Sequence, residues 1–219
     1  MLRVLGICAI VLAVSGTASG AILTFTMEIV YSGDVSPGGP SPWLTATFDD
    51  HDSAGSVTLT LTASNLVTGE FATEWYFNLD PSMDLDSLAI AQISKTGSFD
   101  NPTVTKDEDA LKADGDGNFD ILFAFANDDG VDTRFTAGDS VQFTLSGIST
   151  LTVDSFAFTS VDHGTTGLYS AAHIQGIVGG NSDWVTCPEP VKVPEPATVG
   201  LLAVGTLGLV MRRRRAQRS

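Results

Sequence analysis

The sequence predicts an all-β protein, an antiparallel β-sandwich of the jelly-roll or Ig-like kind with about eight to ten strands. Apolar and polar residues alternate in several short segments, which is the pattern of strands that bury one face. Stretches rich in Gly, Asp, Asn, Ser and Pro separate these segments, and no long helical period occurs between the two termini. No repeat of fixed period is present, so a single β-sandwich domain over residues 21–185 is expected.

Five segments carry this alternation most clearly. They are 22–31, 56–64, 73–80, 118–127 and 139–148. The first aligns alternate side chains from Leu23 to Tyr31 on one face. The fourth carries four apolar side chains on one face, Phe119, Ile121, Phe123 and Phe125. Segments 43–49 and 151–160 are two further strand candidates, whereas 107–115 has the composition of a single helical turn.

The first 20 residues have the three parts of a secretory signal peptide. Arg3 supplies the positive charge, residues 4–14 form an apolar core, and small residues follow. Ala18 and Gly20 fit the two pockets of signal peptidase, so cleavage is expected between Gly20 and Ala21. Residues 1–20 are therefore expected to form a signal helix that is removed during export.

The cysteine content excludes an intrachain disulfide in the processed protein. Cys8 lies inside the apolar core of the signal peptide and is expected to leave with it. Cys187 is then the one remaining cysteine. It is expected to be an idle thiol at the surface.

The C-terminal segment predicts a linker followed by a membrane anchor. Residues 186–196 contain four prolines and are expected to form a semi-rigid linker. Residues 197–211 are uncharged, which predicts a transmembrane helix within 197–219, although a relaxed span needs ~20 residues. Four arginines follow directly and are expected to hold this end in the cytoplasm. They are Arg212, Arg213, Arg214 and Arg215.

This tail resembles the PEP-CTERM sorting segment over residues 193–217. The Pro-Glu-Pro motif stands at Pro194, Glu195 and Pro196, and a short hydrophobic stretch and the arginine cluster follow it in order. The resemblance implies recognition and processing by exosortase in a Gram-negative bacterium. It also implies transient anchoring in the inner membrane, followed by release to the cell surface or the extracellular matrix. A second Pro-Glu-Pro at 188–190 is assigned to the linker, although it makes the processing position ambiguous.

The charge distribution argues against nucleic acid as a partner. The chain has 26 acidic and 11 basic residues and a formal net charge of −15. Every acidic residue lies between Glu28 and Glu195. A body this acidic repels phosphate backbones and suits either a solvated exterior or a surrounding rich in divalent cations.

One acidic segment has the spacing of calcium ligands. Oxygen-bearing side chains stand at alternate positions along it, Asp114, Asp116, Asn118 and Asp120. This spacing predicts a calcium site, although an EF-hand loop has Gly at the position of Phe119 and Glu at that of Phe125. The alternative is a plain Asp-Gly hairpin turn. A second acidic loop, 127–132, lies at the other end of the same predicted strand.

The histidines and the larger aromatic residues suggest further sites. His51 is expected to be a solvated turn residue, and one hairpin is expected to bring His163 near His173 as structural residues. Exposed aromatic rings on a β-sandwich would stack on sugars. The candidate rings are Trp43, Trp75, Trp184, Tyr31, Tyr76 and Tyr169. Trp75 is assigned to the core, and Tyr76 is expected on the opposite, exposed face.

These observations predict an exported, non-enzymatic surface or biofilm-matrix protein, without a catalytic residue or a cofactor other than calcium. Its expected partners are signal peptidase, exosortase and the membrane. A carbohydrate-binding module for exopolysaccharide is the alternative. A glycoside hydrolase is the third interpretation, and it would require two carboxyl groups ~5 to 9.5 Å apart in a cleft.

Overall fold

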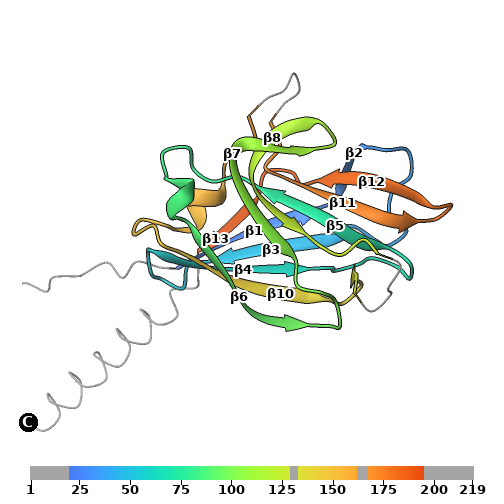
Figure 1. The fold of residues 1–219 in the computed structure, drawn as a ribbon, viewed down its shortest axis with the longest axis horizontal. Coiled ribbons are helices and arrows are strands. Elements are labelled where there is room, and N and C mark those ends of the chain that lie inside the picture. Colours follow the sequence, from blue (N-terminus) through green and yellow to red (C-terminus); the bar gives the residue numbers. More distant parts are fainter. Residues whose placement is uncertain (1–19, 129–132, 162–166, 195–219) are drawn as a thin grey trace, which may run out of the picture. The chain divides into compact units, whose positions relative to one another are not determined.

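Two antiparallel β-sheets face each other in the structure, a computed structural model that describes residues 20–128, 133–161 and 167–194 (Figure 1). This arrangement confirms the all-β, two-sheet prediction. The predicted signal and transmembrane helices fall outside the described residues. Within those residues, no helix is both long and apolar enough to cross a membrane.

The first sheet has six strands. In spatial order they are β13 (Val191–Pro194), β1 (Ala21–Met27), β3 (Leu44–Asp49), β4 (Ser56–Thr62), β10 (Ser140–Ser146) and β6 (Ala89–Thr96). The segments predicted at 43–49, 56–64 and 139–148 are confirmed as β3, β4 and β10. Along each of them buried apolar side chains alternate with half-buried or exposed polar ones as expected, because one face covers the core and the other faces solvent.

The second sheet has seven strands. Six of them run in the order β2 (Ile29–Ser32), β12 (Asn181–Thr186), β11 (Ser170–Ile177), β5 (Phe71–Phe77), β8 (Asp116–Ala124) and β7 (Thr103–Ala113). The seventh, β9 (Phe135–Thr136), pairs with β5. Two short 3₁₀ helices, η1 (Leu85–Ser87) and η2 (Val153–Phe156), complete the described elements.

Aromatic rings from both sheets meet in the core. The Phe48 ring of the first sheet lies 5.4 Å from the ring of Phe77 in the second, and it stacks on Phe156 of η2 at 4.5 Å. Trp75 is fully buried, as predicted, and its indole N–H donates to the Ser170 hydroxyl at 3.1 Å. This hydrogen bond satisfies the buried N–H donor of the Trp75 ring.

The prediction of one continuous strand over 22–31 is wrong. The chain leaves the first sheet after Met27 and joins the second at Ile29, so β1 and β2 belong to different sheets. Glu28 stands at the crossing, where its charged side chain is exposed and its N–H donates to the carbonyl of Thr186 at 3.1 Å. The alternation of apolar residues continues through the crossing, which hides the change of sheet from the sequence.

Two other expectations about secondary structure are also wrong. The segment 107–115, predicted as a helical turn, lies mostly in the long strand β7. The segment 151–160, predicted as a strand, contains η2. A capping box between Thr152 and Ser155 starts this helix, and the i, i+3 spacing of Val153 and Phe156 buries both side chains.

A second, smaller apolar cluster lies on the outer face of the second sheet. Its buried members are Tyr76, Ala113, Phe119 and Ala171. The distal half of the β7–β8 hairpin turns over this face and covers it (Figure 1). Phe119 therefore packs here, 5.4 Å from the ring of Tyr76, and not in the main core with Ile121 as predicted.

Candidate functional site

The start of the sorting segment is an edge strand of the folded body. β13 pairs with β1 in antiparallel register, so that Pro194 lies opposite Ala21. The last residue of an edge strand suits proline, which has no N–H to donate. Residues 191–194 fall within the predicted linker and are instead part of the sheet. Glu195, Pro196 and the arginines 212–215 lie outside the described residues.

An ion pair links β13 to the 3₁₀ helix η2. The ammonium of Lys192 donates to both carboxylate oxygens of Asp154, at 2.7 and 2.6 Å. Both side chains are largely exposed, so the pair contributes little stability on its own. All four residues of β13 are exposed, which leaves this strand accessible along its outer side.

The predicted calcium segment begins with an Asp-Gly hairpin turn. Ala113 pairs with Asp116, and the two residues between them, Asp114 and Gly115, have φ angles of 51° and 79°. Positive φ at both central positions is the signature of a type I′ turn. The alternative interpretation of this segment as a hairpin turn is therefore confirmed. The Asp114 carboxylate accepts a hydrogen bond from the hydroxyl of Ser32 on β2.

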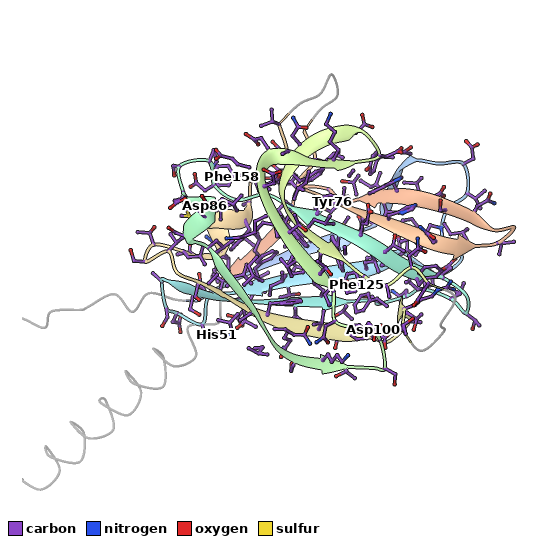
Figure 2. All side chains as sticks on the ribbon, viewed as in Figure 1. His51, Tyr76, Asp86, Asp100, Phe125 and Phe158 are labelled. Carbon is purple, nitrogen blue, oxygen red and sulfur yellow. The ribbon has the colours of Figure 1, made fainter. Side chains whose placement is uncertain are left out.

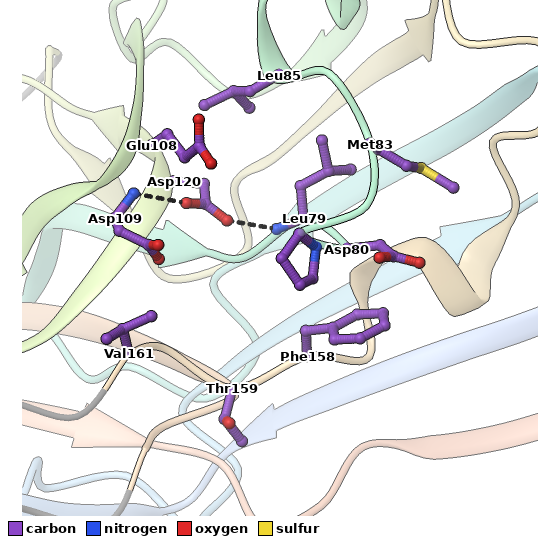
Figure 3. A pocket seen from close by; sticks show the side chains of 11 residues that line it. Leu79, Asp80, Met83, Leu85, Glu108, Asp109, Asp120, Phe158, Thr159 and Val161 are labelled. Atoms are coloured by element: carbon purple, nitrogen blue, oxygen red, sulfur yellow. Dashed lines mark hydrogen bonds between the residues drawn. The ribbon is translucent and has the colours of Figure 1, made fainter.

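Asp120 is separated from the turn by its own hydrogen bonds. Its carboxylate is buried and accepts from the main-chain N–H groups of Leu79 at 2.8 Å and Asp109 at 2.9 Å (Figure 3). Over the described ranges, no three or more His, Cys, Asp or Glu side chains are placed to hold a metal ion. Calcium binding by Asp114, Asp116, Asn118 and Asp120 stays a prediction from the sequence.

A small acidic cavity lies beside Asp120, between the β7–β8 hairpin and the segment after β5 (Figure 3). It measures about 110 Å³, and its lining includes Asp80, Glu108, Asp109, Met83 and Phe158. Partial burial and the neighbouring carboxylates of Asp120 and Glu108 raise the pKa of Asp109 above its ordinary value. The two hydrogen bonds of Asp120 join β7, β8 and the post-β5 segment, so this carboxylate acts as a structural anchor.

The aromatic residues considered for sugar binding are mostly withdrawn from solvent. Tyr76, expected to be exposed, is only 3% exposed because the β7–β8 hairpin covers it. That expectation is wrong. Trp184 is half-buried and stacks on His173 with ring centroids 4.5 Å apart. Trp43 is buried and donates its indole N–H to the carbonyl of Gly39 at 2.8 Å. Tyr31 and Tyr169 are half-buried.

The histidines occupy structural positions where they are described. His51 is an exposed turn residue with a φ of 47°, as expected (Figure 2). His173 lies on β11, where its Nδ1 is 3.0 Å from the Thr73 hydroxyl. Burial lowers the pKa of His173 below its ordinary value, against the opposing effect of Glu74 and other carboxylates. His163, its predicted hairpin neighbour, lies outside the described residues.

Cys187 is not the surface thiol that was expected. It follows β12 and is buried within the main core cluster. Burial raises the pKa of Cys187 to about 12, so the thiol stays protonated at neutral pH.

Comparisons with known proteins identify the tail but not the body. The family model of the PEP-CTERM protein-sorting motif matches residues 192–215. No curated protein matches the chain. A similar solved structure is the CBM3a-L domain with flanking linkers from scaffoldin cipA of the cellulosome of Clostridium thermocellum. It is 12% identical over 82% of this chain and 97% of that chain, with a TM-score of 0.31.

Proposed function

Because the chain carries a PEP-CTERM protein-sorting motif at residues 192–215, we propose that it is an exported protein whose tail is a temporary anchor. In this proposal signal peptidase removes residues 1–20, and the segment 197–219 holds the protein in the inner membrane. Exosortase then processes the chain near Pro194, Glu195 and Pro196. The family match, which covers the motif, the apolar stretch and the arginines together, carries this proposal.

For the folded body we propose a non-enzymatic role at the cell surface or in the extracellular matrix. Its acidic exterior suits a hydrated surrounding rich in divalent cations. Asp120, the one buried carboxylate among the acidic residues that line the cavity, is held by two main-chain donors and has a structural task. The use of this carboxylate in holding the fold supports a non-enzymatic role for the body.

Binding of exopolysaccharide is the second candidate. The observation that favours it is the half-buried Trp184 on the outer face of the second sheet, next to Tyr76 and His173. A ring that keeps part of its surface in solvent is available for stacking on a sugar. A glycan-array screen of the wild-type protein and of Trp184→Ala, with and without calcium, tests this candidate. Binding lost in the variant would support it, and no binding by either would contradict it.

The two Pro-Glu-Pro sequences provide a matched test of the sorting proposal. We expect replacement of Pro194, Glu195 and Pro196 by alanine to leave the protein unprocessed and membrane-associated. The same replacement at Pro188, Glu189 and Pro190 is expected to leave processing unchanged. The measurement is an immunoblot of membrane and released fractions, with the intact mass of each species. Normal processing of the first variant would contradict the proposal.

A further inference from the structure

A carboxylate at the start of the fold is buried without a cationic partner. Asp50 follows β3 and is only 8% exposed. Its Oδ1 accepts from the main-chain nitrogen of Ala21 at 3.0 Å, and its Oδ2 from that of Val153 at 3.4 Å. Within the described part of the chain, neither Lys nor Arg forms an ion pair with it.

Amide donors hold such a carboxylate, as they hold Asp120, and a positive charge beside it would stabilise it further. Removing an anion from water carries a large desolvation penalty, and two amide donors offset only part of it. The position that a cation would have to occupy is already filled by a nitrogen atom, that of Ala21. In the precursor this nitrogen is a neutral amide.

Cleavage after Gly20 changes the charge of this atom. Water breaks the bond between the Gly20 carbonyl carbon and the Ala21 nitrogen. The hydroxyl goes to Gly20 and a proton to the nitrogen. The new carboxyl of Gly20 then loses a proton and the new amine gains one. The departing segment thus ends in a carboxylate, and Ala21 begins with an ammonium.

We infer that removal of residues 1–20 creates an internal ion pair between the α-ammonium of Ala21 and the carboxylate of Asp50, so that export processing completes the fold. The inference rests on the proposed export of the chain. It also specifies the cleavage position, because only a chain that begins at Ala21 places its ammonium 3.0 Å from Oδ1. A chain beginning at Ile22 lacks the nitrogen that Asp50 binds.

Packing around residue 20 agrees with this position. A side chain at Gly20 would place its Cβ 2.7 Å from the main-chain nitrogen of Asp52 and 2.8 Å from Asp52 Oδ1, closer than contact allows. Glycine fits at this point of the fold, whereas a larger residue before Ala21 would not. The small residue that signal peptidase requires before the cut is thus also the residue that the fold accepts there, and cleavage after it leaves the ammonium beside Asp50.

A comparison of two chains that differ by one residue tests the ion pair. Residues 21–219 and residues 20–219, both purified in detergent, are unfolded thermally with Asp50 and with Asp50→Asn. We expect the chain that begins at Ala21 to have a midpoint about 2 to 4 °C higher. The difference should vanish in Asp50→Asn and persist in the control Asp86→Asn, an exposed carboxylate in η1. Equal midpoints, or a difference that survives Asp50→Asn, would overturn the inference.

A chemical measurement keeps the test decisive if Asp50→Asn does not fold. The α-amine of the chain beginning at Ala21 should be acylated by acetic anhydride about tenfold more slowly than that of the chain beginning at Gly20. Equal rates would overturn the inference. N-terminal sequencing of the exported protein should return Ala21 first. Another first residue would overturn the inference and leave the sorting proposal intact.

Discussion

The hydroxyl of Tyr31 donates a hydrogen bond of 3.3 Å to the main-chain carbonyl of Ala113. Tyr31 lies on β2 and Ala113 on β7, which are the two opposite edges of the second sheet. The contact is made because the tip of the β7–β8 hairpin reaches across the intervening strands. Tyr76 and Phe119 are enclosed beneath it. The outer face of the sheet thereby has a small core of its own.

Replacing Tyr31 by phenylalanine should loosen the hairpin tip without disturbing the main core. Loss of this hydrogen bond is expected to cost about 1 kcal/mol in the free energy of unfolding. Hydrogen exchange at residues 111–116 should accelerate more than exchange in β4. Tyr169→Phe is the control, because the Tyr169 hydroxyl forms no hydrogen bond in the described ranges. Unchanged exchange at the tip would show that the hydrogen bond of Tyr31 does not hold the hairpin in place.

Cys187 should be unreactive until the protein unfolds. Its thiol is buried and its pKa is raised to about 12, so little thiolate is available to attack a disulfide reagent. We expect negligible labelling by a thiol reagent under native conditions and complete labelling in denaturant. Rapid labelling of the native protein would show that the thiol is accessible. Cys187→Ala is the blank for the assay.

The stability of the protein should depend on His173 below neutral pH. Burial depresses the folded-state pKa below 6.5, so the unfolded chain binds the proton more tightly. The contribution of the neutral ring to the free energy of unfolding is therefore present above pH 6.5 and is lost as the pH falls through the folded-state pKa. We expect the difference in thermal midpoint between wild type and His173→Asn to shrink over this range. A constant difference from pH 8 to pH 4 would contradict the assigned shift.

The four arginines should determine whether the tail stops in the membrane. Changing Arg212, Arg213, Arg214 and Arg215 to glutamine removes the charge that retains the C-terminal end in the cytoplasm. We expect impaired anchoring and reduced processing, measured as membrane-bound and released fractions. Arg218→Gln, one charge in the same segment, is expected to behave as wild type. Full retention and processing of the fourfold variant would refute this account of the tail.

Calcium binding at the predicted segment requires Asp120 to exchange two main-chain donors for a metal ion. If it does so, the thermal midpoint should be higher in excess calcium than in chelator. Asp114→Asn should abolish that increase, and Asp86→Asn, at an exposed position of η1, should not. The same midpoint in calcium and in chelator would remove the calcium hypothesis.

The strands that sequence alternation predicted correctly are those that bury one face and solvate the other. β4 and β10 are of this kind, with serine or threonine at most outward positions. β11 was not predicted as a strand, because small residues on both of its faces are buried and the alternation is lost. β7 was missed for the opposite reason, since charged residues occupy both faces of an exposed edge strand.

The candidate sites differ in how far local sequence could predict them. Asp114 and Gly115 identify a hairpin turn by themselves, because few other residues tolerate positive φ at both positions. The burial of Tyr76 depends on a hairpin more than thirty residues away folding back over it, and no local pattern encodes that contact. The approach of Asp50 to Ala21 is equally remote in sequence and follows from the pairing of β1 with β3.

The position of Pro194 has a mechanical consequence. β13 is four residues long and, among the described strands, pairs only with β1. A pull on the tail reaches the sheet at Pro194 and acts first on the hydrogen bonds that join β13 to β1. We therefore expect β13 to detach from the sheet under load before β1, β3 and the aromatic core behind them are strained.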